Sequence, residues 1–242
     1  MELKGKIFIR GEIHTLTGLH IGGAKSALDI GGVDLSVVKK PGGVPYIPGS
    51  SLKGKLRSLL ARAAGTTCIT AREAKNNHKS DEKDAQHIAE IFGLPGNEPG
   101  ETAEEGTPRT TRLIVRDADL DEEKFKERFG EELELGFSEV KWENSINRTT
   151  GTAQHPRQLE RVPAGAVFKF EMVYDKYDDD KYKSHLEYII QAMRLLQSDY
   201  LGGHGSRGYG KIAFENVEFF ERDVEDFKDK EKEPKRMEGF VF

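Results

Sequence analysis

The sequence of 242 residues has little cysteine and no long hydrophobic run. Its one cysteine, Cys68, excludes a disulfide framework and favours a reducing environment. No apolar stretch approaches the ~18 residues that a membrane-spanning helix needs, so we expect no membrane partner. The first residues, Met1–Lys6, lack the apolar stretch of a secretory signal, and we therefore expect a cytoplasmic location.

The chain also lacks an overall excess of basic residues, which at first argues against nucleic acid as a partner. It has 37 Lys and Arg against 42 Asp and Glu, a net charge of −5. However, residues 1–65 contain ten basic and four acidic residues, so they carry +6 and the remainder carries −11. Because charges further apart than about 8 Å are largely screened at physiological salt, the local charge decides phosphate binding. A basic N-terminal region is therefore compatible with nucleic acid.

Hydrophobic periodicity predicts six core elements in the order strand, helix, strand, strand, helix, strand. Residues 6–14 alternate apolar and polar side chains, as a strand with one buried face does. The remaining strands are expected at 111–118, 166–174 and 211–219, and the helices, from apolar residues at helical spacing, at 51–65 and 181–201. This order predicts an α+β, ferredoxin-like fold (βαββαβ), in which two helices cover an antiparallel sheet.

Two segments do not fit this pattern and are interpreted as insertions into a single domain that spans residues 1–220. Residues 66–110 contain a short helical stretch near 81–92 and a loop rich in Pro, Gly and Glu. Residues 137–163 are polar and suggest a hairpin. The tail, 221–242, is a run of mixed charge that we expect to be solvated.

A glycine-rich segment near the C-terminus matches the dinucleotide-binding pattern G-x-G-x-x-G at Gly203–Gly208. That motif needs a strand before it and a helix after it, whereas here a helix precedes and a strand follows, so a nucleotide site is excluded. Residues 207–214 approach an RNA-stacking signature, but Lys211 replaces an aromatic residue and the match is interpreted as coincidence. What remains is a loop of five glycines whose backbone N–H groups can approach phosphates closely.

The predicted helix 51–65 begins with basic side chains. Ser51 is a candidate N-cap, and Lys53, Lys55 and Arg57 follow without an acidic residue between positions 50 and 65. A basic first turn is unfavourable with the helix dipole, whereas an anion bound at the helix N-terminus would explain it. This pattern favours phosphate binding over a merely solvated face.

Metal ligands and catalytic groups are less clearly marked. Cys68, His78 and His87 could supply three zinc ligands, but their spacing follows no standard finger, and scattered histidines with a lone cysteine are the better interpretation. Asp34 stands alone in a glycine-rich loop, and composition alone marks it only as a turn residue.

The motifs together resemble the RAMP superfamily of CRISPR proteins, and more closely the backbone subunits of type III-A interference complexes. The segments that carry the resemblance are Leu16–Gly23, Ile30–Asp34, Pro45–Arg57, Glu139–Arg148, Pro156–Arg161 and Asp199–Lys211. They cover the chain from about residue 5 to 219 in the family's order. One departure is Ser36, where the family commonly has proline two residues after its loop aspartate.

The resemblance implies an RRM-like palm with a lid (66–110) and a thumb (137–163), of which several copies stack along one CRISPR RNA together with other complex subunits. It further implies an endoribonuclease that cuts complementary single-stranded target RNA at regular intervals with a divalent metal, expected to be Mg²⁺. Asp34 matches the family's loop aspartate and is predicted to be catalytic, as a base or as a Mg²⁺ ligand. The predicted RNA-binding residues are His20, Ser51, Lys53, Lys55, Arg57, Arg148, Arg157, Gly203, Gly205 and Arg207.

Two alternatives stay open at this point. The chain could be a non-catalytic RNA-binding scaffold, although a scaffold has no need of a carboxylate beside a phosphodiester that repels it. It could also be a RAMP endonuclease that processes CRISPR precursor RNA, for which His20 is the candidate near the first helix.

Overall fold

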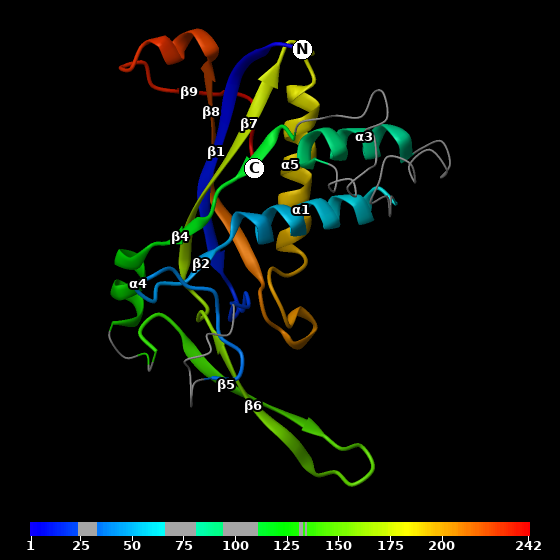
Figure 1. Cartoon of the computed structure of the whole chain (residues 1–242), viewed down its shortest axis with the longest axis vertical. Helices are drawn as coiled ribbons and strands as arrows, with labels where there is room; N and C mark the ends of the chain where they lie inside the picture. The colour runs from blue at the N-terminus through cyan, green and yellow to red at the C-terminus, as the bar shows by residue number, and fades with distance from the viewer. Residues whose placement is uncertain (24–32, 66–80, 94–110, 131–132, 134) are drawn as a thin grey trace, which may run out of the picture.

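The computed structural model describes residues 1–23, 33–65, 81–93, 111–130, 133 and 135–242. Its centre is an antiparallel sheet of long, twisted strands (Figure 1). The long strands are β1 (Leu3–Thr15), β7 (Val167–Tyr177) and β8 (Ile212–Asp223), and the short ones are β2 (Tyr46–Ile47), β3 (Leu113–Val115), β4 (Ala118–Leu120) and β9 (Lys235–Arg236). The strand order is β2-β4-β7-β1-β8-β9, with β3 also paired to β7. This order confirms the ferredoxin-like arrangement of the predicted elements.

Alternation in β1 assigns one face of the sheet to the core. Ile7, Ile9 and Ile13 are completely buried, whereas Phe8, Arg10 and Glu12 between them are half-buried or exposed. The pairing with β8 shifts between Arg10 and Glu12, a bulge that gives β8 an extra residue relative to β1. At Gly11, beside this bulge, a Cβ would lie 3.0 Å from the ring of Phe170, so the small residue lets that ring pack over the strand.

Helices cover the core face of the sheet. They are α1 (Gly49–Ala63), α3 (Asp81–Phe92) and α5 (Tyr182–Gln197), and Figure 1 shows α5 running along the sheet with α1 and α3 beside it. Leu52, Leu56 and Leu60 of α1 and Leu186 and Met193 of α5 are at most 1% exposed. Burying such side chains contributes roughly 1.5–3 kcal/mol each, so this layer is the main source of stability. No helix in the described ranges is long and apolar enough to cross a membrane.

Helix α1 begins two residues earlier than predicted, and Ser51 is not its cap. The N-cap is Pro48, which has no side-chain capping bond; instead the N–H of Gly49 donates to Oδ1 of Asp117 at 2.7 Å. Asp117 lies between β3 and β4, so the single strand expected at 111–118 is divided there. Gly49 is required at this junction, since a Cβ would lie 2.2 Å from the carbonyl oxygen of Val115.

Sequence reasoning missed one helix, α4 (Glu122–Phe129). It lies outside the helical layer, on the other side of β4 (Figure 1). Its N-cap is Asp121, whose carboxylate accepts the N–H of Lys124 at 3.3 Å, and Glu122 and Glu123 fill the first turn. This acidic start is a standard helix signal, but the helix is only eight residues long and was read as a connection.

The expectation of a solvated C-terminal tail is wrong for its last part. Strand β8 continues to Asp223, a short 3₁₀ helix covers Val224–Lys228, and β9 then pairs back onto β8. The rings of Phe240 and Phe242 pack against the core, with centroids 5.6 Å from Phe219 and 5.8 Å from Phe214. These apolar residues after the charged run bring the chain back to the sheet.

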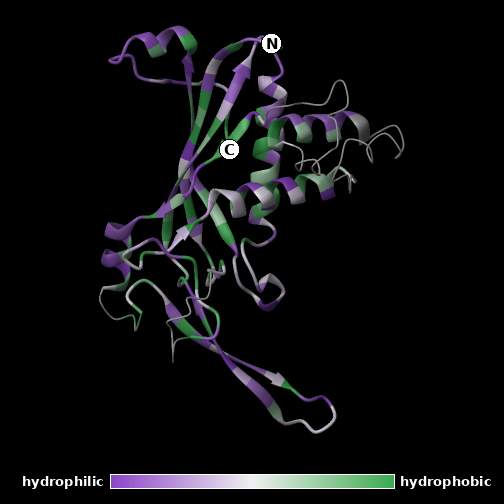
Figure 2. Cartoon of the chain, in the orientation of Figure 1, coloured by the Kyte–Doolittle hydropathy of each residue, from purple (hydrophilic) through white to green (hydrophobic). Residues whose placement is uncertain are grey.

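The segment 137–163 forms a two-stranded hairpin that projects away from the sheet (Figure 1). Its strands are β5 (Glu139–Ile146) and β6 (Ala153–Arg161). They pair from Glu139 with Arg161 to Ile146 with Ala153, and the register shifts by one residue between Glu143 and Ser145. Figure 2 shows that hydrophobic residues gather along the sheet and the helices that cover it, while the hairpin is mainly hydrophilic. The hairpin therefore has no core of its own, and its base holds it to the domain.

Candidate functional site

Asp34 lies in an extended segment that runs beside the base of the hairpin. Its side chain is exposed, and Oδ2 accepts the backbone N–H of Gln158 on β6 at 2.9 Å. Leu35 continues the contact: its N–H donates to the carbonyl of Gln158 at 3.3 Å, and its carbonyl accepts the N–H of Glu160 at 2.9 Å. The carboxylate of Asp34 is thus held at a fixed place on the hairpin base while it stays open to solvent.

The buried carboxylate of Glu160 joins this segment to the hairpin. Glu160 is 1% exposed; its Oε2 accepts the N–H of Val37 at 3.0 Å, and its Oε1 accepts from the hydroxyl of Ser138 and pairs with Lys39 Nζ at 2.5 Å. Burial raises the pKa of Glu160, but the bonds from Lys39, Ser138 and the Val37 N–H outweigh it and hold the pKa below its ordinary value. The ionised carboxylate fixes both strands of the hairpin base to the Asp34 segment.

His20 connects the same point to the glycine-rich loop. It is 5% exposed, and its Nδ1 lies 2.7 Å from the carbonyl oxygen of Glu160, which can only accept, so Nδ1 carries a proton. Its own carbonyl accepts the N–H of Gly203 at 2.8 Å, and its ring packs edge-on against His204 at 5.4 Å. Gly202 adopts a positive φ of +77°, and a Cβ there would lie 2.3 Å from the carbonyl oxygen of His20.

The glycine-rich loop is fastened to strand β5 by Glu143. The carboxylate of Glu143 accepts from Arg207 Nη1 at 3.1 Å and from the hydroxyl of Tyr209 at 2.8 Å. Burial raises the pKa of Glu143, and these two donors outweigh it and lower the pKa. Gly205 lies against the ring of Tyr200, where a Cβ would come within 2.0 Å of a ring carbon. Glycine here therefore serves packing inside the loop.

Most basic side chains of α1 have partners within the protein. Lys53 Nζ donates to the Thr111 hydroxyl at 3.0 Å and to the Leu113 carbonyl at 2.8 Å, and burial, together with the nearby charge of Arg57, lowers its pKa. Lys55 Nζ lies 3.6 Å from the centre of the Tyr200 ring and 3.4 Å from Asp199. Burial also lowers the pKa of Arg57.

These contacts change the reason for the basic first turn. One carboxylate already lies at the N-terminus of α1, because Asp117 accepts the N–H of Gly49 there. Asp199 additionally pairs with Arg62, so two cations of this helix meet one internal acid. Phosphate binding by Ser51, Lys53, Lys55 and Arg57 stays a prediction. Ser51 is half-buried, and its backbone N–H donates to the carbonyl of Pro48 at 3.0 Å.

The structure divides the predicted site residues into three places. The first place is the hairpin base, where Gln158, Glu160 and Glu143 link the predicted residues. Those residues are Asp34, His20, Gly203, Gly205, Arg207 and Arg157. Arg157 lies opposite Glu143 in the hairpin. Those of α1 form a second place, joined to the glycine-rich loop by the contact of Lys55 with Tyr200. Arg148 is exposed at the turn of the hairpin, away from both.

Candidate metal ligands fall at a different position from Asp34. Within the described ranges, the one group of three side chains that could hold an ion is His87, Glu90 and His185. Cys68 and His78, which the sequence suggested beside His87, lie outside the described residues. Asp34 belongs to no such group, so the described part of the chain offers Mg²⁺ one carboxylate there. That donor suits Mg²⁺ only if water and RNA phosphates supply the other ligands.

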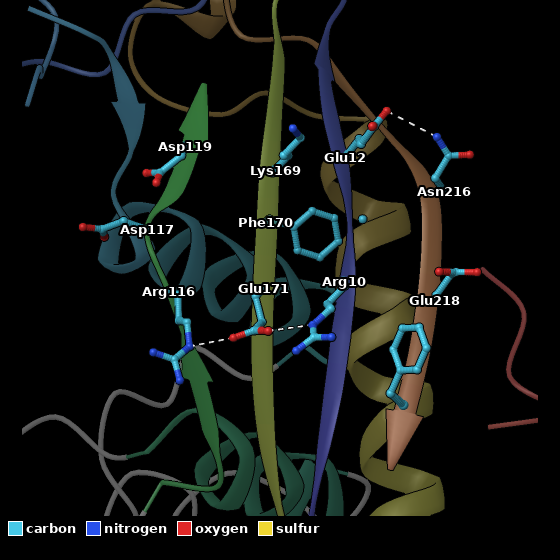
Figure 3. Close-up of a pocket in the computed structure, with 12 residues that line it drawn as sticks. Arg10, Glu12, Arg116, Asp117, Asp119, Lys169, Phe170, Glu171, Asn216 and Glu218 are labelled. Carbon is cyan, nitrogen blue, oxygen red and sulfur yellow. Dashed lines mark hydrogen bonds and ion pairs between the residues drawn. The ribbon is translucent and has the colours of Figure 1, made fainter. Parts of the chain in front are cut away.

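A hollow on the open face of the sheet is a separate feature (Figure 3). It measures about 630 Å³, and Glu171 lies in it between Arg10 and Arg116, at 2.7 and 2.8 Å. The lining of the hollow carries charges of both signs, with acids outnumbering bases. None of the predicted site residues lines it.

Comparison with known proteins identifies the family. Residues 12–213 match the sequence model of the RAMP superfamily. The chain belongs to the RAMP superfamily.

Relatives within the RAMP superfamily agree over nearly the whole chain. The protein of Methanocaldococcus jannaschii named CRISPR system Cms endoribonuclease Csm3 is 41% identical and covers 90% of this chain and 82% of its own length. The protein of that name from Enterococcus italicus is 40% identical, with coverages of 86% and 89%. The crystal structure of a Csm3–Csm4 subcomplex in the type III-A CRISPR-Cas interference complex aligns with a TM-score of 0.58 at 30% identity, over 98% of this chain and 90% of that one.

Sequence reasoning missed the residues that hold the candidate site together. Glu160 and Glu143 are isolated acids in a mixed-charge segment, and nothing local marks them as buried or half-buried anchors. Tyr200, directly before the glycine-rich loop, is the exception: an aromatic residue beside five glycines is a signal that the glycines leave space for a ring.

Proposed function

We propose that this chain is the backbone subunit of a type III-A CRISPR interference complex and cuts single-stranded target RNA paired to a guide CRISPR RNA. Relatives 36–41% identical are named endoribonucleases, and the aligned solved structure belongs to a type III-A complex. The partners are the guide RNA, the target RNA, further copies of this chain and other subunits of the complex. The proposal includes a cytoplasmic location, where such RNAs are met.

The observation that carries the catalytic part is the placement of Asp34. One of its oxygens is anchored by the N–H of Gln158, and the side chain is exposed at the base of a projecting hairpin. A hairpin inserted into a guide–target duplex would displace a target nucleotide at this base and turn its 2′-OH toward the adjacent phosphate. Asp34 then accepts the proton of that 2′-OH and the oxygen attacks phosphorus. The P–O5′ bond breaks, and the 5′-oxygen takes a proton from water, giving a 2′,3′-cyclic phosphate and a 5′-hydroxyl.

A divalent ion, expected to be Mg²⁺, would stabilise the charge that develops on the phosphate, and in the other form of the proposal Asp34 is its ligand from this chain instead of the base. The other side chains of the site contribute by holding its segments in place. Glu160 holds the Asp34 segment and the hairpin base together, and His20 ties both to the glycine-rich loop. The loop brings the backbone of Gly203 and Gly205 and the cation of Arg207 to the same side.

Guide RNA is proposed to lie across the glycine-rich loop and α1. The cations assigned to phosphates there are Lys53, Lys55, Arg57 and Arg207, with His20 and Ser51 beside them, while Arg148 and Arg157 would contact RNA from the hairpin. The local charge of +6 in residues 1–65 supports this path. Because Lys53 and Lys55 already have internal partners, their contribution to RNA is electrostatic at longer range rather than a dedicated clamp.

One observation favours the alternative, a non-catalytic RNA-binding scaffold. Asp34 has a structural partner in Gln158, so its carboxylate could serve only to fix the loop to the hairpin.

The deciding experiment is incubation of the reconstituted complex with end-labelled complementary RNA, with Mg²⁺ and then with EDTA. We expect evenly spaced products that disappear with the chelator, because each copy of the subunit cuts once. Guide and target bound without cleavage would favour the scaffold, and a single product would favour precursor processing.

A further inference from the structure

Three ligand-type side chains meet where helix α3 packs on helix α5, away from Asp34. His87 and Glu90 are three residues apart on α3 and therefore share a face of that helix. His185 comes from the first turn of α5 and is completely buried, and Glu90 is 6% exposed. Buried imidazole and carboxylate groups at one point need a shared explanation, because each is costly to bury without partners.

The separations match the edges of a metal coordination tetrahedron. His87 Nδ1 lies 3.0 Å from His185 Nε2, which lies 3.4 Å from Glu90 Oε2, and the three ligand atoms are all within 4.8 Å of one another. Ligands bound to zinc at 2.0–2.1 Å in tetrahedral geometry are roughly 3.3 Å apart. Two histidines and one glutamate form a common zinc donor set.

The two rings lie side by side in partly buried surroundings. Their centroids are 5.1 Å apart with the rings edge-on, and burial lowers the pKa of His185 to about 4 and also lowers the pKa of His87. A metal on His185 Nε2 needs the ring proton on Nδ1, and the hydroxyl of Tyr174, 2.7 Å from Nδ1, is placed to accept that N–H. Outer contacts of this kind fix the tautomer of histidines that bind metals.

Charges of both signs face the cluster. Arg112 is paired with Asp179 and lies 3.7 Å from Glu90, and Lys181 Nζ bonds both oxygens of Glu90 at 2.8 and 3.1 Å. The Lys181 side chain is 35% exposed and can move into water. A divalent ion then takes over its role as the partner of Glu90.

We propose that His87, Glu90 and His185 form a site for Zn²⁺ or a similar divalent transition metal that clips α3 onto α5. The competing arrangement is an N–H···N hydrogen bond between two neutral rings with no metal. In that case either His87 Nδ1 or His185 Nε2 carries a proton, whereas a metal needs the lone pair of both nitrogens. This site is independent of Asp34 and of RNA cleavage.

The test uses the purified chain, stripped of metal and then titrated with Zn²⁺, with binding and thermal unfolding both measured. We expect one Zn²⁺ per chain and a rise in Tm with added Zn²⁺, because a ligand that binds only the folded state stabilises it. His87→Ala should abolish the Tm shift and weaken binding by more than 100-fold. Tyr174→Phe, which fills the same space, should weaken binding roughly 10–100-fold, as loss of an outer hydrogen bond does.

Matched controls separate this site from other ligands. His155→Ala, on the exposed strand β6, and Asp34→Ala should both bind Zn²⁺ as the wild type does. Substituting Co²⁺ should give the visible absorption of a low-coordinate site in the wild type and not in His87→Ala. Zn²⁺ binding that survives His87→Ala, or a wild-type chain with no Tm shift, would overturn the proposal and leave the hydrogen-bonded pair.

Discussion

Replacement of Glu160 tests how the Asp34 segment is held. In the folded chain its carboxylate is 1% exposed and accepts from the Val37 N–H, the Ser138 hydroxyl and the Lys39 ammonium. Glu160→Ala leaves all three donors without their acceptor, and breaking a buried ion pair in this way costs about 3–5 kcal/mol. Glu160→Gln keeps an acceptor for Val37 but loses the charge. We therefore expect it to lower the free energy of unfolding by about 1.5–3 kcal/mol, the usual contribution of a hydrogen bond to a charged group.

The measurement is urea unfolding of the purified chain at pH 7, with Glu127→Gln as a control. Glu127 is an exposed acid on α4, and surface changes of this kind stay within about 0.5 kcal/mol. The ranking Glu160→Ala, then Glu160→Gln, then the control is the predicted order of destabilisation. If the free energy of unfolding of Glu160→Ala lies within about 1 kcal/mol of the wild-type value, the carboxylate does not hold these segments together.

The same variant has a pH signature. The pKa of Glu160 in the folded chain lies below its ordinary value of 4.5, so its ionised form contributes stability above that pH. That contribution is lost as the pH falls through the lowered pKa. The difference in unfolding free energy between the wild type and Glu160→Gln should therefore be full at pH 7 and shrink below about pH 4.5. A difference that grows on acidification would contradict the ionised, buried assignment.

Two further predictions concern the glycine-rich loop and the hairpin. Gly205→Ala should destabilise the chain by about 1–3 kcal/mol in the same unfolding assay, because its Cβ would overlap the ring of Tyr200. The control is Gly54→Ala, in open space on α1, which should stabilise the chain by up to about 1 kcal/mol. Arg157→Gln should weaken RNA binding and reduce the slope of log affinity against log salt by about 1, measured by filter binding; an unchanged slope would show that Arg157 touches no phosphate.

The parts of the fold that local patterns encode could be predicted from the sequence. Ile7, Ile9 and Ile13 alternate, and the leucines of α1 recur at helical spacing, so the sheet face and the helix follow from periodicity alone. The start of α1 could not be predicted, because its cap is the carboxylate of Asp117, 68 residues further on. Helix α4 was missed since a single short helix gives a weak periodic signal.

The candidate site also has parts that the local sequence reveals and parts that it does not. The glycine-rich loop was found from its composition and Asp34 through the resemblance to a family, and the structure adds what holds them. Glu160 binds Val37 from 123 residues away, and His20 binds Glu160 across 140 residues, so no local spacing could reveal either contact. Basic charge on α1 was visible in the sequence, but its internal partners Thr111 and Asp199 were not.

The most direct test of the central claim is the single-turnover rate of target cleavage by complexes assembled with Asp34→Asn. Asparagine keeps an oxygen that accepts the N–H of Gln158, so the loop stays in place while the charge is lost. Loss of a general base or metal ligand predicts a rate at least about 100-fold lower, with guide and target binding unchanged. Cleavage by Asp34→Asn at the wild-type rate would contradict the catalytic role of this carboxylate.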